Sequence, residues 1–198
     1  MKSLLVPMML GRVERTAAEA ACALAEDGGG AVEVLVGLNA VSPLVTGWEY
    51  FPAGMYDTLD ETTRAAAQAL AADVRLSMVS EEAEHHVRVA GSFWQTPAEQ
   101  ALSSARIADL IVLGKPRKPS DPDDRLFASL LLNSGRPVLV VPEARVQRPR
   151  FRRVVIAWKA SREAARAVHD AMPLLERAEK IDVVGIAEGE RADLSPPD

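Results

Sequence analysis

The chain has 198 residues, of which 48% are apolar and 26% are charged, and its formal net charge is −5. This composition is typical of a soluble globular protein with room for one full domain and part of a second. The negative charge gives no general attraction to phosphate backbones or anionic membranes, and no apolar run approaches the roughly 18 residues of a membrane span. We therefore expect a cytoplasmic protein that binds neither nucleic acid nor membrane.

Apolar runs and helical periodicities alternate along residues 1–142. The patterns predict strands at 3–8, 32–37, 86–90, 110–113 and 138–141, and helices at about 13–26, 57–81, 97–108 and 123–134. Short connections between such elements imply parallel strands covered by helices. We predict an α/β domain over residues 1–142, a five-stranded parallel sheet with helices on both faces, of the Rossmann-like or flavodoxin-like type.

Local signals mark several helix ends. Asp57 or Thr58 is expected to cap the second helix, and Thr96 the third, with Pro97 at its first helical position. Ile107 is expected on the buried face of that third helix.

Potential metal ligands are few. The single cysteine, Cys22, lies in an Ala-rich helical stretch and is predicted to be a buried core residue. His85 and His86 invite a metal site, but adjacent residues of a strand point to opposite faces of the sheet, so the two imidazoles cannot converge on one ion. We expect no metal site.

The segment 39–55 is a long connection that contains Trp48, Tyr50 and Phe51. Such long loops are uncommon in compact domains and are often functional. Two interpretations remain open: a lid or docking loop with aromatic anchors, or rings that fold back over the sheet as a small satellite core.

After residue 142 the pattern of the first elements returns. A Pro- and Arg-rich linker is predicted at 143–152, followed by strand, helix and strand at 153–158, 161–175 and 181–186. The offset from the first copy is close to 150 residues, which indicates a duplication. The second copy, 153–198, is partial. We expect either that the sequence is a fragment of a longer tandem protein or that packing on another domain or chain completes this copy.

Several of these pieces together resemble the universal stress protein family. They are the opening Leu4–Pro7, the strand Leu110–Gly114 with its loop and helix, the closing Ser134–Pro142, and the second copy with Val154–Ala167. The resemblance implies a cytoplasmic stress-response protein. It also implies a homodimer or tandem pseudo-dimer formed through the last strand, which places Val138, Leu139, Val140 and Val141 at the interface.

ATP-binding members of that family carry the signature G-x2-G-x9-G-[ST] after the fourth strand. Glycines let the backbone approach the phosphates, and N–H and hydroxyl groups hold them. Here Gly114 matches the first glycine, whereas Arg117, Phe127 and Ala128 replace the second glycine, the third glycine and the hydroxyl. The signature is degenerate, so we expect no cofactor, with ATP as the alternative.

Two functions from different classes follow. The sequence contains no G-x-S-x-G, P-loop or H-E-x-x-H motif, so we expect no enzyme activity. The first hypothesis is a non-enzymatic stress protein that acts by dimerisation or by binding a protein partner. The alternative is a sensor that binds an adenine nucleotide or another anionic ligand with Gly114, Lys115 and Arg117, at the loop after the fourth strand.

Overall fold

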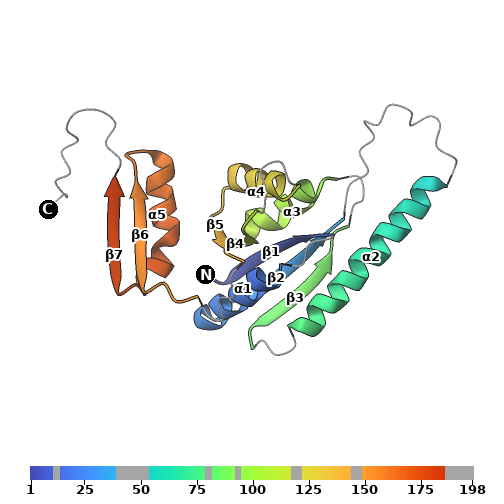
Figure 1. Ribbon diagram of the computed structural model, residues 1–198, viewed down its shortest axis with the longest axis horizontal. Coiled ribbons are helices and arrows are strands. Elements are labelled where there is room, and N and C mark those ends of the chain that lie inside the picture. Colours follow the sequence, from blue (N-terminus) through green and yellow to red (C-terminus); the bar gives the residue numbers. More distant parts are fainter. Residues whose placement is uncertain are drawn as a thin grey trace. The chain divides into compact units, whose positions relative to one another are not determined.

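The computed structural model describes residues 1–10, 14–38, 54–78, 82–91, 95–116, 122–143 and 149–185. In chain order its elements are β1 (Ser3–Met9), α1 (Arg15–Gly28), β2 (Ala31–Gly37), α2 (Met55–Ser77), β3 (Glu84–Val89), α3 (Pro97–Ile107), β4 (Leu110–Gly114), α4 (Pro122–Asn133), β5 (Val138–Val141), β6 (Arg153–Trp158), α5 (Arg162–Leu175) and β7 (Lys180–Gly185). They form two compact units, Met1–Pro149 and Arg150–Asp198, and each is described by itself (Figure 1).

The first unit contains a parallel sheet with the strand order β3-β2-β1-β4-β5. α3 and α4 pack on the face that carries Leu5, Leu35 and Ile111, and α2 packs on the opposite face at Val36. Figure 1 shows α1 on the same side of the sheet as α2. The predicted five-stranded parallel sheet with helices on both faces is therefore confirmed. Cys22 is buried in α1, as predicted.

A proline in the central strand shortens one of its two ladders. β1 pairs with β2 along seven residues, from Ser3 to Met9, but it pairs with β4 only at Leu4 and Leu5. Pro7 lies two residues farther on and has no N–H group to donate to a neighbouring strand. The hydrogen-bonded ladder between β1 and β4 thus ends before Pro7. Side chains hold the carboxyl halves of these two strands together.

The predicted cap of α3 is present, and α5 has a side-chain cap as well. Thr96 Oγ1 accepts from the Glu99 N–H at 3.2 Å, and Ser161 Oγ accepts from the Ala164 N–H at 3.2 Å. The prediction for α2 was wrong. Its N-cap is Gly54, with φ of 87°, because the helix begins at Met55, two residues earlier than expected.

Ile107 was also wrongly placed on a buried face. It is the last residue of α3, and its side chain is 75% exposed because it lies on the opposite side of the helix from the buried residues Ala101 and Ala105. None of the described helices is long and apolar enough to cross a membrane.

The second unit is a parallel strand-helix-strand motif, as predicted, in which β6 pairs with β7 from Arg153–Lys180 to Trp158–Gly185. Most of its side chains are exposed or only partly buried. That it is a copy of the first unit stays a prediction. Residues 144–148 of the predicted linker and residues 39–53 of the segment 39–55 lie outside the described residues.

Candidate functional site at the switch point of the sheet

The strand order places a candidate ligand site between the carboxyl ends of β1 and β4. From β1 the chain runs outward through β2 to β3, and it then returns to the other side of β1 as β4 and β5. In open parallel sheets ligands bind in the crevice where the order reverses in this way. The short ladder between these two strands leaves room there for side chains.

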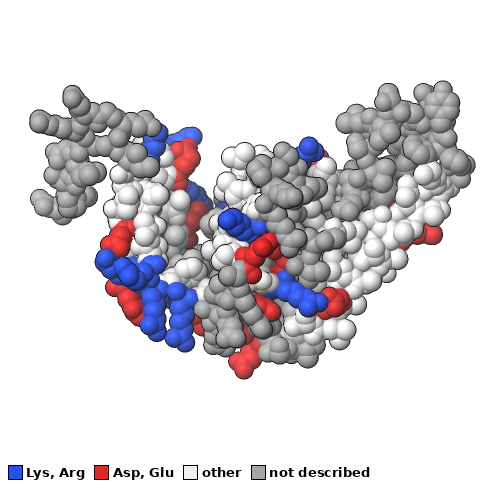
Figure 2. Space-filling view, viewed as in Figure 1, with Lys and Arg blue, Asp and Glu red and all other residues white. Residues whose placement is uncertain are grey.

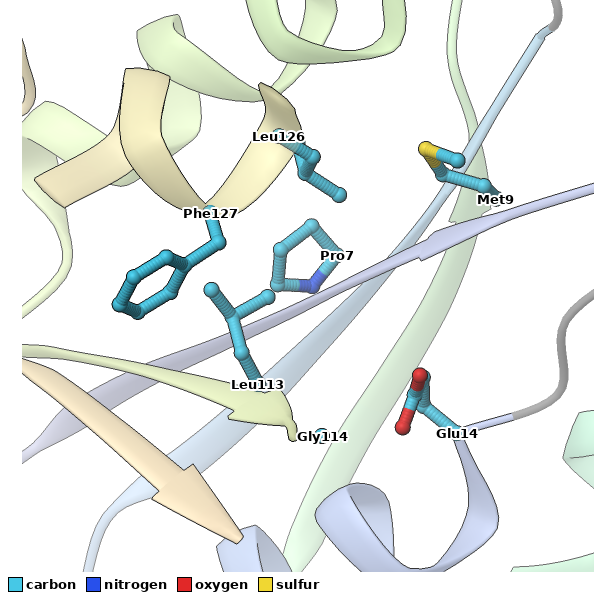
Figure 3. Close-up of a pocket in the computed structure, with 7 residues that line it drawn as sticks. All are labelled: Pro7, Met9, Glu14, Leu113, Gly114, Leu126 and Phe127. Atoms are coloured by element: carbon cyan, nitrogen blue, oxygen red, sulfur yellow. The ribbon is translucent and has the colours of Figure 1, made fainter. Parts of the chain in front are cut away.

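A small cavity occupies this point. Its volume is about 20 Å³, enough for about one water molecule and far below the roughly 300–1,000 Å³ of small-molecule pockets. Figure 3 shows its lining, which is Pro7, Met9, Glu14, Leu113, Gly114, Leu126 and Phe127. Apart from Glu14 the side chains are apolar. As it stands, this cavity offers no space for a nucleotide.

Gly114, at the end of β4, is in contact with a carboxylate of the same chain. A Cβ atom at this position would clash with Oε2 of Glu14 and would lie 2.6 Å from Cδ of the same side chain. The φ angle of Gly114 lies outside the left-handed region, so its backbone conformation does not require glycine. What requires glycine is the close approach of the Glu14 side chain.

The other residues of the predicted ligand loop are only partly gathered here. Lys115 follows Gly114, and its N–H donates to the Val141 carbonyl at 2.9 Å, which ties the loop to β5. It borders a separate hollow of about 430 Å³ with Pro116, Pro142 and Glu143. Arg117 lies outside the described residues. Phe127 packs against the core cluster beneath α3 and α4, and Ala128 is exposed.

A buried amide closes the end of β2. The side chain of Gln100, on α3, accepts from the Leu38 N–H at 2.8 Å and donates to the Leu38 carbonyl at 3.0 Å and to the Gln95 carbonyl at 2.6 Å. The backbone groups of Leu38, which a ligand at this edge would meet, are thus bound by the protein itself. Sequence reasoning missed both Glu14 and Gln100, because their partners are distant in sequence.

The predicted interface residues form β5, an edge strand that pairs with β4 alone among the described strands. Val141 is buried, Val138 and Leu139 are half-buried, and Val140 is 38% exposed. An apolar edge strand is a surface on which another strand can pair.

Charged side chains gather in one further place. Figure 2 shows Lys and Arg side chains at the end of the second unit where β6 and β7 begin, with acidic side chains among them. Arg152 forms an ion pair with Glu179 at 3.4 Å, and Lys180 pairs with Asp182 at 3.0 Å. These cations are therefore largely neutralised within their own unit.

The two adjacent histidines lie apart, as the strand pattern predicted. His85 Nδ1 lies 2.9 Å from the Ala83 carbonyl oxygen, and the exposed His86 lies 3.3 Å from a carboxylate oxygen of Glu84. Among the described residues no three His, Cys, Asp or Glu side chains are arranged to hold a metal ion.

Comparison with known proteins gives matches in structure only. No family model and no curated protein matches the sequence. A protein of the universal stress protein family from Burkholderia pseudomallei has a TM-score of 0.52 and 20% identity, over 70% of this chain and 95% of its own. The chain has the fold of the universal stress proteins. Universal stress protein UspA from Lactobacillus plantarum is similar as well, with a TM-score of 0.54 and 15% identity over 71% of this chain and 97% of its own.

A third match extends into the second unit. The universal stress protein from Archaeoglobus fulgidus DSM 4304 has a TM-score of 0.66 and 14% identity, over 94% of this chain and 67% of its own. Met1–Pro149 makes up 149 of 198 residues, about 75%, so this alignment must include part of the second unit. The aligned residues therefore extend beyond the five-stranded sheet.

Proposed function

We propose that this chain is a cytoplasmic, non-enzymatic stress-response protein that acts by dimerisation or by binding a protein partner, without a nucleotide. The observation that carries the proposal is the state of the switch point. There the cavity, lined by apolar side chains and Glu14, holds about 20 Å³, which is too little space for a nucleotide. With no room for a nucleotide at the described switch point, we infer that the protein acts through its surface.

The surface that suits this role best is the edge of β5. Val140 exposes an apolar side chain there, and Leu131 and Leu132 of the preceding helix are exposed as well. Within the described strands nothing pairs with the outer edge of β5. Pairing of β5 with β5 of a second copy would extend the sheet across a dimer and cover these side chains.

Sedimentation velocity tests the dimer directly. Val140→Lys places a charge on the edge strand and should weaken association at least about tenfold, since edge lysines oppose strand pairing. Leu76→Lys is the matched control, because Leu76 is an exposed apolar residue on α2. A wild-type protein that stays monomeric at high concentration, or equal effects of the two substitutions, would contradict the use of β5.

The alternative, an anionic-ligand sensor, is favoured by one observation, the hollow of about 430 Å³ beside Lys115. Calorimetric titration of the wild-type protein with ATP, ADP and AMP separates the two functions. The proposal expects no binding of any of the three. Micromolar binding that Lys115→Ala weakens would instead establish the sensor.

A further inference from the structure

The sheet of the first unit has two edges, β3 and β5, and their side chains differ. β5 is apolar along its whole length. β3 instead carries Glu84, His86 and Arg88 as exposed side chains on one face, and charged side chains are typical of edge strands that resist pairing. A more specific protection of β3 comes from helix α2.

The hydrogen bonds of β3 show which of its backbone groups face outward. The N–H of Ala90, just after the strand, donates to the Val36 carbonyl of β2 at 2.9 Å. Successive residues of a strand direct their N–H and C=O groups to opposite sides. Every second residue before Ala90 therefore also faces β2, whereas His85, Val87 and Val89 direct their backbone groups away from it. These are the groups with which an added strand would pair.

Arg75 of α2 binds one of these outward groups. Its Nη2 donates to the Val87 carbonyl at 2.6 Å, and Val87 is the middle residue of the three. Figure 1 shows α2 next to β3, and Val87 packs against the cluster that includes Ala67 and Ala71 of this helix. An added strand would lie about 4.8 Å from β3. The guanidinium group of Arg75 therefore occupies the place that the backbone of such a strand would need.

A second arginine lies on the same side of α2. Arg64 precedes Arg75 by about three helical turns, so the two side chains leave the helix in the same direction. Arg64 Nη2 lies 3.5 Å from the carbonyl oxygen of Gly91, which follows β3, and also pairs with Asp60. Guanidinium groups of α2 thus meet backbone carbonyls at β3 and just beyond its end.

The geometry points to Arg75 as the residue that closes the β3 edge, so that copies of this chain associate through β5 alone. The inference rests on the proposed function for the use of β5, and it goes beyond it because it sets the number of copies. A sheet with two open edges can add copies at both ends and form an open-ended chain, whereas a sheet with one open edge forms a closed dimer.

Sedimentation velocity of Arg75→Ala tests the inference. The variant should form species larger than a dimer, with an association constant for the added step at least about tenfold above that of the wild-type protein. This gain, about 1.4 kcal/mol, corresponds to one or two backbone hydrogen bonds across the new interface. Arg106→Ala is the matched control and should behave as the wild-type protein, because Arg106 is likewise the basic residue in the last turn of a helix.

Two further variants guard against an indirect effect of the substitution. Arg75→Met keeps the apolar part of the side chain and removes its donors, so it should associate as Arg75→Ala does while circular dichroism shows a folded protein. His85→Pro in the Arg75→Ala background removes an outward N–H of β3, a position where edge strands tolerate proline, and should restore wild-type association. The inference is overturned if both Arg75 variants associate no more than Arg106→Ala, or if His85→Pro leaves the larger species intact.

Val140→Lys separates this inference from the proposed function. Alone it should weaken the dimer, and together with Arg75→Ala it should give a dimer again, now paired through β3. A double variant that associates no more than Val140→Lys alone would overturn the role of Arg75. If Val140→Lys itself associates like the wild-type protein, the proposed use of β5 fails, and the comparison of Arg75→Ala with Arg106→Ala still decides whether Arg75 closes the β3 edge.

Discussion

The two strand-helix-strand motifs of this chain have the same topology and very different burial. β1 and β2 pair from Ser3–Ala31 onward, and β6 and β7 pair in the same register from Arg153–Lys180. By this alignment Val34 corresponds to Val183, yet Val34 is 0% exposed and Val183 is 64% exposed. Leu5 and Val155 show the same contrast, at 1% and 65%.

The difference lies in what surrounds each motif. In the first unit β3, β4 and β5 extend the sheet on both sides, and helices cover both faces. In the second unit, two strands and one helix are described, and apolar side chains remain in contact with solvent. A local pattern is thus enough to form the motif, whereas burial and stability come from its neighbours.

The largest expected effect comes from the same substitution at the two corresponding positions. Val34→Ala should lower the free energy of unfolding of the first unit by about 2 kcal/mol, because it leaves a cavity in a packed core. Val183→Ala should change the stability of the second unit by less than about 0.5 kcal/mol. Urea unfolding with hydrogen exchange as the readout measures both. A cost at Val183 as large as that at Val34 would show that β7 is covered in solution.

An intermediate effect is expected at the helix caps. Thr96→Ala and Ser161→Ala each remove a side-chain acceptor from a helix N-terminus, which should cost about 1 kcal/mol. The loss at Thr96 should appear throughout the first unit, and the loss at Ser161 only in the amides of α5, because the second unit has little packed core. Hydrogen exchange of the two variants distinguishes these patterns. Faster exchange in α1 of the Ser161 variant would instead mean that the units unfold together.

The smallest effect concerns the first residues of β1. The backbone N–H groups of Lys2 and Ser3 donate to Asp109 Oδ2 at 2.7 and 3.2 Å, and the Lys2 bond is the main reason that the pKa of Asp109 lies below its ordinary value. At the corresponding place in the second unit, Arg152 instead forms an ion pair with Glu179 through its side chain.

The sign of the pH dependence follows from this lowered pKa. The carboxylate stabilises the fold above the unfolded value of about 3.9, and the stabilisation is lost as the pH falls through the lower folded value. Asp109→Asn should cost less than about 1 kcal/mol at pH 6, because the group is only partly buried, and should not add to the loss of stability at pH 3. Urea unfolding at the two pH values checks this. An unchanged difference between wild type and variant at both values would refute it.

The sequence predicts the fold well because the strands are short apolar runs bounded by Gly or Pro. β5 was placed at 138–141 with its observed ends, since the run is framed by Pro137 and Pro142. The prediction for Ile107 was wrong because this residue lies on the opposite side of α3 from the buried residues Ala101 and Ala105. The predicted start of α2 was wrong because its N-cap is a glycine and not one of the polar residues that usually mark a helix N-terminus.

The sequence indicated where a site could lie, but it did not indicate which residues fill that place. Gly114 was predicted to follow the fourth strand, and it is the last residue of β4, next to the switch point. The residues that fill the site are Glu14, from the start of α1, and Gln100, from the middle of α3. Nothing near Gly114 in the sequence points to either, because these contacts exist only after the sheet has assembled.

The single proline in β1 leaves the sheet weakly connected between β1 and β4. β1 pairs with β2, and β2 with β3, along most of their lengths, whereas β4 pairs with β1 only at Leu4 and Leu5. Under hydrostatic pressure, which favours the loss of internal voids, the sheet would open first along this line, where the cavity lies. The first unit would then separate into a group of three strands and a group of two along the switch point.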